Sequence, residues 1–154
     1  MIIQQISVNT REVQVFIREL DAYQETLYPS ESNHLDSIET LMMPNVFFVG
    51  AMEENELKGI GAVKVFETYG EIKRMFIPEK YRGKGIGKKI ILALESHLIQ
   101  QKTFKATLET GIHQTAAIRL YENMGFTRTG PFGSYNKDPL SIFMEKKLPN
   151  PCKR

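Results

Sequence analysis

A basic, glycine-rich loop is the part of the sequence whose residue types and spacing best suit chemistry. It spans Arg82–Lys88 and reads Arg-Gly-Lys-Gly-Ile-Gly-Lys. Glycines let backbone N–H groups crowd around a bulky anion, and the positive end of a following helix dipole favours negative charge there. From Lys73 to Lys89 the chain carries seven Lys or Arg residues and only one acid, Glu79. The loop therefore predicts a site for a polyphosphate ligand.

Spacing distinguishes this loop from two common phosphate-binding loops. A P-loop follows G-x-x-x-x-G-K-[ST]; if Gly87 and Lys88 ended it, the first glycine would fall on Arg82 and the hydroxyl residue on Lys89. A dinucleotide loop G-x-G-x-x-G that starts at Gly83 would need a glycine at Lys88. Neither pattern fits the chain.

Two stretches resemble the Gcn5-related N-acetyltransferase (GNAT) superfamily. Arg82-x-x-Gly85-x-Gly87 resembles its R/Q-x-x-G-x-G/A signature, and Ala117–Phe126 resembles its A-x-x-L-Y-E-x-x-G-F segment. The two occur in the expected order, and the resemblance extends over roughly residues 2–148. It implies that the loop wraps the pyrophosphate of acetyl-CoA, the acyl donor, and that no metal is needed. The alternative is a glycine-rich turn that caps a solvated basic helix.

The resemblance also implies particular contacts with acetyl-CoA. Backbone groups in the strand before the loop are expected at the pantetheine and the oxyanion, namely those of Met75, Phe76 and Ile77. Backbone or side-chain groups of the loop are expected at the phosphates, namely those of Arg82, Gly83, Lys84, Gly85, Ile86, Gly87 and Lys88. Gln114 stands three residues before Ala117, where the family often has Asn, so its contact to the cofactor arm is expected to be longer or absent.

Transfer of an acyl group from a thioester to an amine requires a base, an oxyanion donor and an acid. Tyr121 is the candidate acid, because the matching tyrosine points at the cofactor sulfur in many GNAT enzymes; the alternative is a core tyrosine with a satisfied hydroxyl. Glu71 and Glu109 are candidate bases, since two branches of the superfamily carry a base at these positions, and Glu71 is slightly preferred. They could also act together through a water, or be solvated strand residues.

Two loops are expected to border the acceptor pocket by the same resemblance. In the first, Tyr28 is a candidate for an aromatic wall, and His34 is a weaker candidate base. In the second, Phe132 and Tyr135 extend the wall. Polar loops with aromatic anchors explain these residues equally well.

The chemistry depends on elements that the apolar pattern predicts in the order β-α-α-β-β-β-α-β-α-β-β. The predicted strands cover residues 2–8, 46–52, 57–66, 71–77, 104–110, 126–129 and 140–147. The predicted helices run from a cap at residue 9 or 10 to about 27, and over 35–42, 85–101 and 114–124. Hairpins mixed with crossover helices indicate a mixed α+β fold, with a central, mostly antiparallel sheet of about seven strands flanked by helices. In the GNAT fold the fourth and fifth strands splay apart around the pantetheine arm.

Length and composition narrow the class of protein. The 154 residues predict one domain over 1–148 with a short tail over 149–154. No run of 18 apolar residues and no signal-like start are present, which predicts a cytoplasmic protein without a membrane partner. Cys152 is the only cysteine and can form no internal disulfide. The net charge of +2 is too small to argue for nucleic acid.

The sequence thus predicts an N-acyltransferase that moves an acetyl group from acetyl-CoA to a primary amine of a small molecule or protein. The amine would attack directly in a ternary complex. A CoA-binding module that senses or binds a partner without catalysis is the alternative, and a nucleic-acid-binding protein is a distant third. Members of the superfamily often pair, so a homodimer is possible by resemblance.

Overall fold

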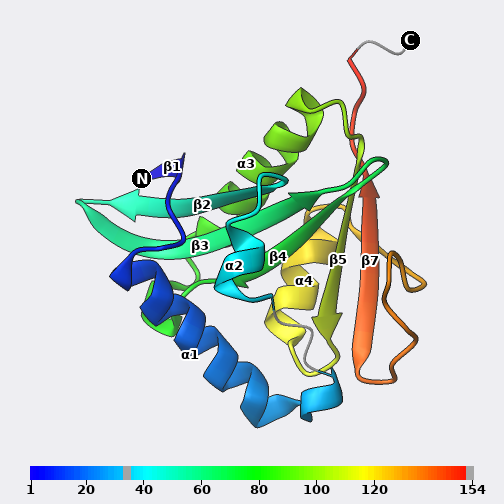
Figure 1. The fold of residues 1–154 in the computed structure, drawn as a ribbon, viewed down its shortest axis with the longest axis horizontal. Helices are drawn as coiled ribbons and strands as arrows, with labels where there is room; N and C mark the ends of the chain where they lie inside the picture. Colours follow the sequence, from blue (N-terminus) through cyan, green and yellow to red (C-terminus); the bar gives the residue numbers. More distant parts are fainter. Residues whose placement is uncertain (33–35, 152–154) are drawn as a thin grey trace.

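The computed structural model describes residues 1–32 and 36–151, which contain one seven-stranded sheet with helices on both faces (Figure 1). The strands are β1 (Ile2–Gln5), β2 (Val46–Glu53), β3 (Glu56–Val65), β4 (Gly70–Phe76), β5 (Lys105–Gly111), β6 (Thr127–Thr129) and β7 (Ser141–Lys147). The helices are α1 (Arg11–Leu27), α2 (Ile38–Leu41), α3 (Ile86–Gln100) and α4 (Thr115–Asn123). Short 3₁₀ helices lie at Ser30–Ser32 and Glu79–Tyr81. The predicted mixed α+β class is confirmed.

The sheet has the order β1-β2-β3-β4-β5-β7-β6, and β4 with β5 is its parallel pair. Helix α3 makes the crossover that a parallel pair requires. The two strands pair only from Gly70–Ala106 to Ile72–Leu108, whereas β5 pairs with β7 along its whole length. Beyond these residues β4 and β5 diverge, as predicted, and backbone groups there are left for other partners.

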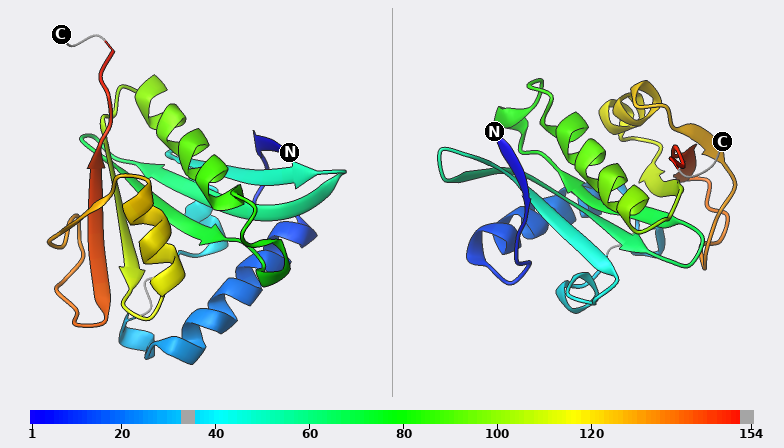
Figure 2. Two further views of the ribbon diagram at one scale, coloured as in Figure 1. Left: turned by 180° about the vertical axis from the view of Figure 1, so that it is seen from behind. Right: turned by 90° about the horizontal axis from the view of Figure 1, so that it is seen from above.

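Two apolar layers hold the helices against opposite faces of the sheet (Figure 2). On one face, α1 buries Val13, Ile17 and Leu20, three positions that recur at helical spacing. Thr10 caps this helix by accepting a hydrogen bond from the Val13 N–H at 3.3 Å. On the other face, α3 and α4 pack into the second layer, and Gly125, with φ of 96°, ends α4 as predicted.

A β-bulge interrupts β4 where the strand leaves its partner. Arg74 and Met75 together oppose Gly61 in β3, and Arg74 has φ of 54°, which is rare outside glycine. In a regular strand Arg74 would point away from the face that Lys73 occupies. Because of the extra residue, Lys73 and Arg74 both reach Asp36 on the α1–α2 side.

Two predicted elements are shorter than expected. The first strand, predicted to reach residue 8, ends at Gln5, because the Ser7 hydroxyl accepts a hydrogen bond from the Asn9 N–H at 3.2 Å and turns the chain. The helix predicted over 35–42 begins at Ile38, where the Ser37 side chain caps it. Residue 35 lies outside the described residues.

Candidate active site

The larger of two neighbouring cavities has a volume of about 420 Å³ and lies between the open end of β4, the start of α3, and α4. On its α3 side the wall is the predicted phosphate loop. Gly87 approaches α4 so closely that a Cβ there would lie 2.9 Å from Leu120 Cδ2. The predicted cofactor residues that line this cavity are Met75, Phe76, Ile77, Arg82, Gly83, Gly85, Ile86, Gly87, Lys88, Gln114 and Ala117. Lys84 is exposed and does not line it.

The loop presents its backbone to this cavity. Gly83 and Gly85 both have φ of 78°, a conformation that strains any residue with a Cβ. Arg82 Nε donates to the Ile77 carbonyl at 2.8 Å and ties the loop to the end of β4. No described residue accepts a hydrogen bond from the backbone N–H groups of residues 83–88. The free N–H groups and the helix dipole at the start of α3 fit a diphosphate.

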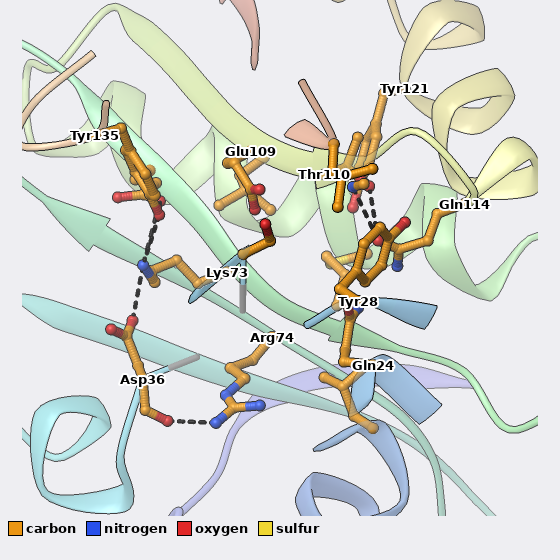
Figure 3. A pocket seen from close by; sticks show the side chains of 17 residues that line it. Gln24, Tyr28, Asp36, Lys73, Arg74, Glu109, Thr110, Gln114, Tyr121 and Tyr135 are labelled. Carbon is orange, nitrogen blue, oxygen red and sulfur yellow. Dashed lines mark hydrogen bonds and ion pairs between the residues drawn. The ribbon is translucent and has the colours of Figure 1, made fainter. Parts of the chain in front are cut away.

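The smaller cavity, of about 90 Å³, lies between the sheet and the segments that surround α1 and α2. Residues common to the walls of both cavities are Leu20, Met75, Gln114 and Tyr121. The two cavities therefore meet at the gap between β4 and β5. In Figure 3, Tyr121 and Gln114 lie on one side of the smaller cavity, and Tyr135, Lys73 and Asp36 lie on the other.

Tyr121 stands at this junction on α4, and only 6% of its surface is exposed. Burial, and then the negative charge of Glu109, raise the pKa of the Tyr121 hydroxyl well above its ordinary value. The hydroxyl therefore stays protonated well above neutral pH and is able to donate its proton. Its ring packs edge-on against Phe126, which starts the chain segment leading to β6.

Glu71 is held in a network of side chains on the α1–α2 side of β4. Its side chain is 7% exposed, its carboxylate accepts a hydrogen bond from the Tyr135 hydroxyl, and Lys73 Nζ lies 3.2 Å from its Oε2. The same Nζ lies 3.0 Å from Asp36 Oδ2. Burial, and then the charge of Glu71, raise the pKa of the Tyr135 hydroxyl. The network ties two loops, those around Asp36 and Tyr135, to one strand.

Glu109 lies farther along β5 and is half-buried. Ser141 Oγ donates to its Oε2 at 2.7 Å, so a neighbouring strand holds the carboxylate in place. Burial, and then the charge of Glu109, raise the pKa of Tyr28 as they do that of Tyr121. Of the two candidate bases, Glu109 is thus the one whose charge is felt at Tyr121.

Arg74 and Asp36 each carry a buried polar atom without a hydrogen bond. Arg74 pairs with Asp21 and donates to the Asp36 carbonyl, but its Nε has no hydrogen-bond partner among the described residues. Asp36 Oδ2 accepts no hydrogen bond from the described residues, although Lys73 is close enough for an ion pair. Buried polar atoms without partners are rare and call for an explanation. Both residues line the smaller cavity.

Tyr28 forms part of the cavity wall, but its hydroxyl is already engaged. It accepts a hydrogen bond from the His113 N–H at 3.1 Å, and its ring stacks on the His113 imidazole at 5.6 Å. Gln114 is also partly engaged, because its Oε1 accepts from the Gly111 N–H at 3.0 Å and from Thr110 Oγ1 at 3.3 Å.

The remaining predicted acceptor residues differ in whether they line the smaller cavity. Tyr135 lines the smaller cavity. Phe132 does not; its ring packs against Tyr69, Tyr135 and Phe143, so it supports the wall from behind. His34 lies outside the described residues.

Four site residues were missed by the sequence reasoning, namely Asp36, Lys73, Arg74 and Ser141. One signal was available, since Glu71 and Lys73 are two apart on a predicted strand and so share a face. Their pairing with Asp36 depends on tertiary structure and leaves no local pattern.

Within the described residues, no helix has the length and apolar character that crossing a membrane requires. The same residues contain no group of three or more His, Cys, Asp or Glu side chains placed to hold a metal ion.

Comparison with known proteins agrees with this geometry. The profile described as "Acetyltransferase (GNAT) family" matches residues 14–126. The "IAA acetyltransferase" of Azospirillum brasilense is 42% identical over 134 residues, which cover 86% of this chain and 88% of that protein.

Two solved structures are also similar. A Klebsiella pneumoniae protein described as an acyl-CoA N-acyltransferase has a TM-score of 0.82 and 37% identity, covering 96% of this chain and 97% of its own. A Bacillus anthracis protein described as a streptothricin acetyltransferase, solved in complex with acetyl coenzyme A, has a TM-score of 0.63 and 25% identity. That match covers 75% of this chain and 69% of the other.

Proposed function

The chain belongs to the acetyltransferase (GNAT) family and is an acetyl-CoA-dependent N-acetyltransferase, and we propose that Tyr121 and Glu109 carry its acetyl transfer to a primary amine. The amine attacks directly, while both substrates are bound. The observation that carries this proposal is that the two cavities meet at Tyr121, which lines both. A donor in one cavity and an acceptor in the other would bring their reacting atoms together at this residue.

Acetyl-CoA supplies the thioester, and the larger cavity suits it. The free N–H groups of Gly83 to Lys88 would hold its diphosphate, with Arg82 and Lys88 nearby. The end of β4 from which β5 diverges, with Met75 and Phe76 and then Ile77 after the strand, would hydrogen-bond its amide-bearing arm on the β5 side. The solved Bacillus anthracis relative with acetyl coenzyme A supports this use of the cavity.

Glu109 is the better candidate for the base. A base must lie within reach of the amine that attacks beside Tyr121, and the Glu71 carboxylate is instead held by Tyr135 and Lys73 on the α1–α2 side of β4. Glu109 is half-buried, is held by Ser141, and lies near enough to Tyr121 to raise the pKa of that hydroxyl. We therefore assign Glu71 to acceptor binding and Glu109 to proton removal.

The proposed roles account for each bond and proton. The amine nitrogen forms a bond to the carbonyl carbon, the carbon–sulfur bond breaks, and one amine proton passes to Glu109. Tyr121 donates its hydroxyl proton to the departing sulfur. When Glu109 takes a proton it loses the charge that raises the pKa of Tyr121, so the tyrosine becomes a stronger acid as the amine attacks.

Steady-state release of CoA thiol from acetyl-CoA, measured over a panel of primary amines, tests this proposal. Tyr121→Phe and Glu109→Gln should each lower kcat about 100-fold or more, the usual scale for a general acid or base. Glu71→Gln should raise the acceptor KM more than it lowers kcat. Calorimetric CoA binding by every variant serves as the control for folding. Binding of CoA by the wild type without thiol release over the whole panel would favour a CoA-binding module instead.

A further inference from the structure

Among the described residues that line the smaller cavity, negative side chains outnumber positive ones. Asp36, Glu71 and Glu109 line it together with two cations, Lys73 and Arg74. Arg74 is already paired with Asp21. The single charge of Lys73 is shared between two carboxylates, at 3.2 Å from Glu71 and 3.0 Å from Asp36. In the part of the chain that the structure describes, three carboxylates thus line the cavity with two cations, one of which is paired with Asp21 outside the lining, and this leaves an excess of negative charge there.

Two further observations agree with this charge balance. Asp36 Oδ2 is buried, and its ion pair among the described residues is with the same Lys73 ammonium that Glu71 uses, so its charge is only partly compensated. Burial, and then the charges of Glu71, Glu109 and Asp36, raise the pKa of the Tyr135 hydroxyl, which faces the same space. A buried charge without compensation is costly, so a ligand that brings positive charge is favoured.

We propose, on the basis of the function proposed above, that the acceptor carries a second, positively charged nitrogen that binds beside Asp36 and Glu71. The reacting nitrogen cannot fill this role, because it must be neutral to attack the thioester. The preferred acceptor is therefore a diamine or the end of a polyamine. One nitrogen reacts near Glu109 and Tyr121, and the other remains charged at the far side of the cavity.

The positions of the carboxylates suit such a ligand. Glu71 pairs across the sheet with Thr107, so Glu109 lies two residues farther along β5. At the usual strand rise this is an offset of roughly 6.6 Å, comparable with the length of a four-carbon diamine. Glu71 and Glu109 can therefore face opposite ends of one short chain.

An acceptor that ends in a carboxylate is disfavoured by the same charges. It would add a fourth negative group to the three that line the cavity, and it would compete with Glu71 and Asp36 for Lys73. The buried Arg74 Nε, which has no hydrogen-bond partner among the described residues, would favour such a group.

Three amines of equal chain length separate these cases, namely 1,4-diaminobutane, butylamine and 4-aminobutyrate. At the end of the chain away from the reacting amine, they carry in that order a cation, a methyl group and an anion. With saturating acetyl-CoA, kcat/KM for thiol release should be about tenfold higher for the diamine than for butylamine, and lowest for 4-aminobutyrate. Asp36→Asn should reduce the ratio of kcat/KM for the diamine to kcat/KM for butylamine to about threefold or less. Because both values are measured on the same protein sample, their ratio does not depend on the fraction of enzyme that is active. Glu39→Gln, which changes an exposed acid on α2, should keep the wild-type ratio.

Results that contradict the cation site can be told apart from results that contradict the proposed acetyl transfer. Equal kcat/KM for the diamine and butylamine, or a preference for 4-aminobutyrate, would overturn the inference while transfer itself stands. Calorimetric binding of the three amines to the CoA-bound protein measures the same preference without turnover. Tight diamine binding without thiol release would support the cation site and overturn the proposed catalysis.

Discussion

The ring of Tyr28 occupies the space in which a side chain at Gly111 would have to lie. A Cβ on Gly111 would overlap the Tyr28 hydroxyl and the ring carbon that bears it. Tyr28 is the C-cap of α1 and Gly111 ends β5, so the contact joins the helix beside the smaller cavity to the strand that forms its wall. The glycine is required here by the close approach of another side chain, not by a left-handed backbone.

Gly111→Ala should therefore destabilise the protein and disturb the acceptor side. Overpacking of this kind costs about 1–3 kcal/mol of unfolding free energy, measured by urea denaturation. Displacement of Tyr28 should also raise the acceptor KM while leaving CoA affinity nearly unchanged. Gly130→Ala is the matched control, because a Cβ there meets no atom within 4 Å. Equal stability of the two variants would mean that Tyr28 does not pack over β5 in solution.

Gly85→Ala should weaken CoA binding, because the cofactor is expected to contact the backbone of this loop. The substitution costs about 1–2 kcal/mol of backbone strain at φ of 78°, and its Cβ would project into the space above the loop. Gly125→Ala provides the matched control, since it has φ of 96° but lies at the end of α4, outside the cavity. Calorimetry should show a loss of CoA affinity for Gly85→Ala alone. A similar loss for both variants would trace the effect to strain rather than to contact.

Those parts of the site that depend on local sequence were predictable. The turns at Gly83 and Gly85, the start of α3 and the stop of α4 at Gly125 follow from glycine spacing and apolar periodicity. The position of Tyr121 at the junction of the cavities follows from its place in α4.

The acceptor side depends on contacts that local sequence does not encode. Lys73 meets Asp36 and Glu71 only because a bulge in β4 and the α1–α2 connection bring them together. The bulge itself falls on Arg74, a residue with no glycine-like signal. The contact between Glu71 and Tyr135 is equally absent from local sequence, because the two residues are 64 positions apart.

The stability of the fold should decline at alkaline pH because two phenols, the buried Tyr121 and the partly buried Tyr135, retain their protons. The pKa values of Tyr121 and Tyr135 are raised by burial and then by nearby carboxylates. An unfolded tyrosine ionises near 10.0 while the folded one does not, so the unfolded state loses protons first and the unfolding free energy falls above that pH. The slope should be about 1.4 kcal/mol per pH unit for each such tyrosine.

Urea denaturation between about pH 9 and pH 11 measures this slope. Tyr121→Phe should reduce the slope of the unfolding free energy against pH by the contribution of one tyrosine, whatever the stability of the variant at neutral pH. An identical slope in wild type and Tyr121→Phe would show that this hydroxyl ionises normally.

A double-mutant cycle tests whether Tyr121 and Glu109 act as one unit. If proton uptake by Glu109 lowers the pKa of Tyr121 during the reaction, removal of either residue deprives the other of part of its effect. Each single variant should lower kcat about 100-fold, and the double variant should fall well short of the product of the two losses. Glu122→Gln supplies the control background, because it changes the exposed carboxylate next to Tyr121 in sequence. Tyr121→Phe should lose the same factor there as in the wild type. If the double variant instead loses kcat by the full product of the two single losses, the acid and the base work independently. The coupling inferred from the raised pKa of Tyr121 would then have no part in catalysis.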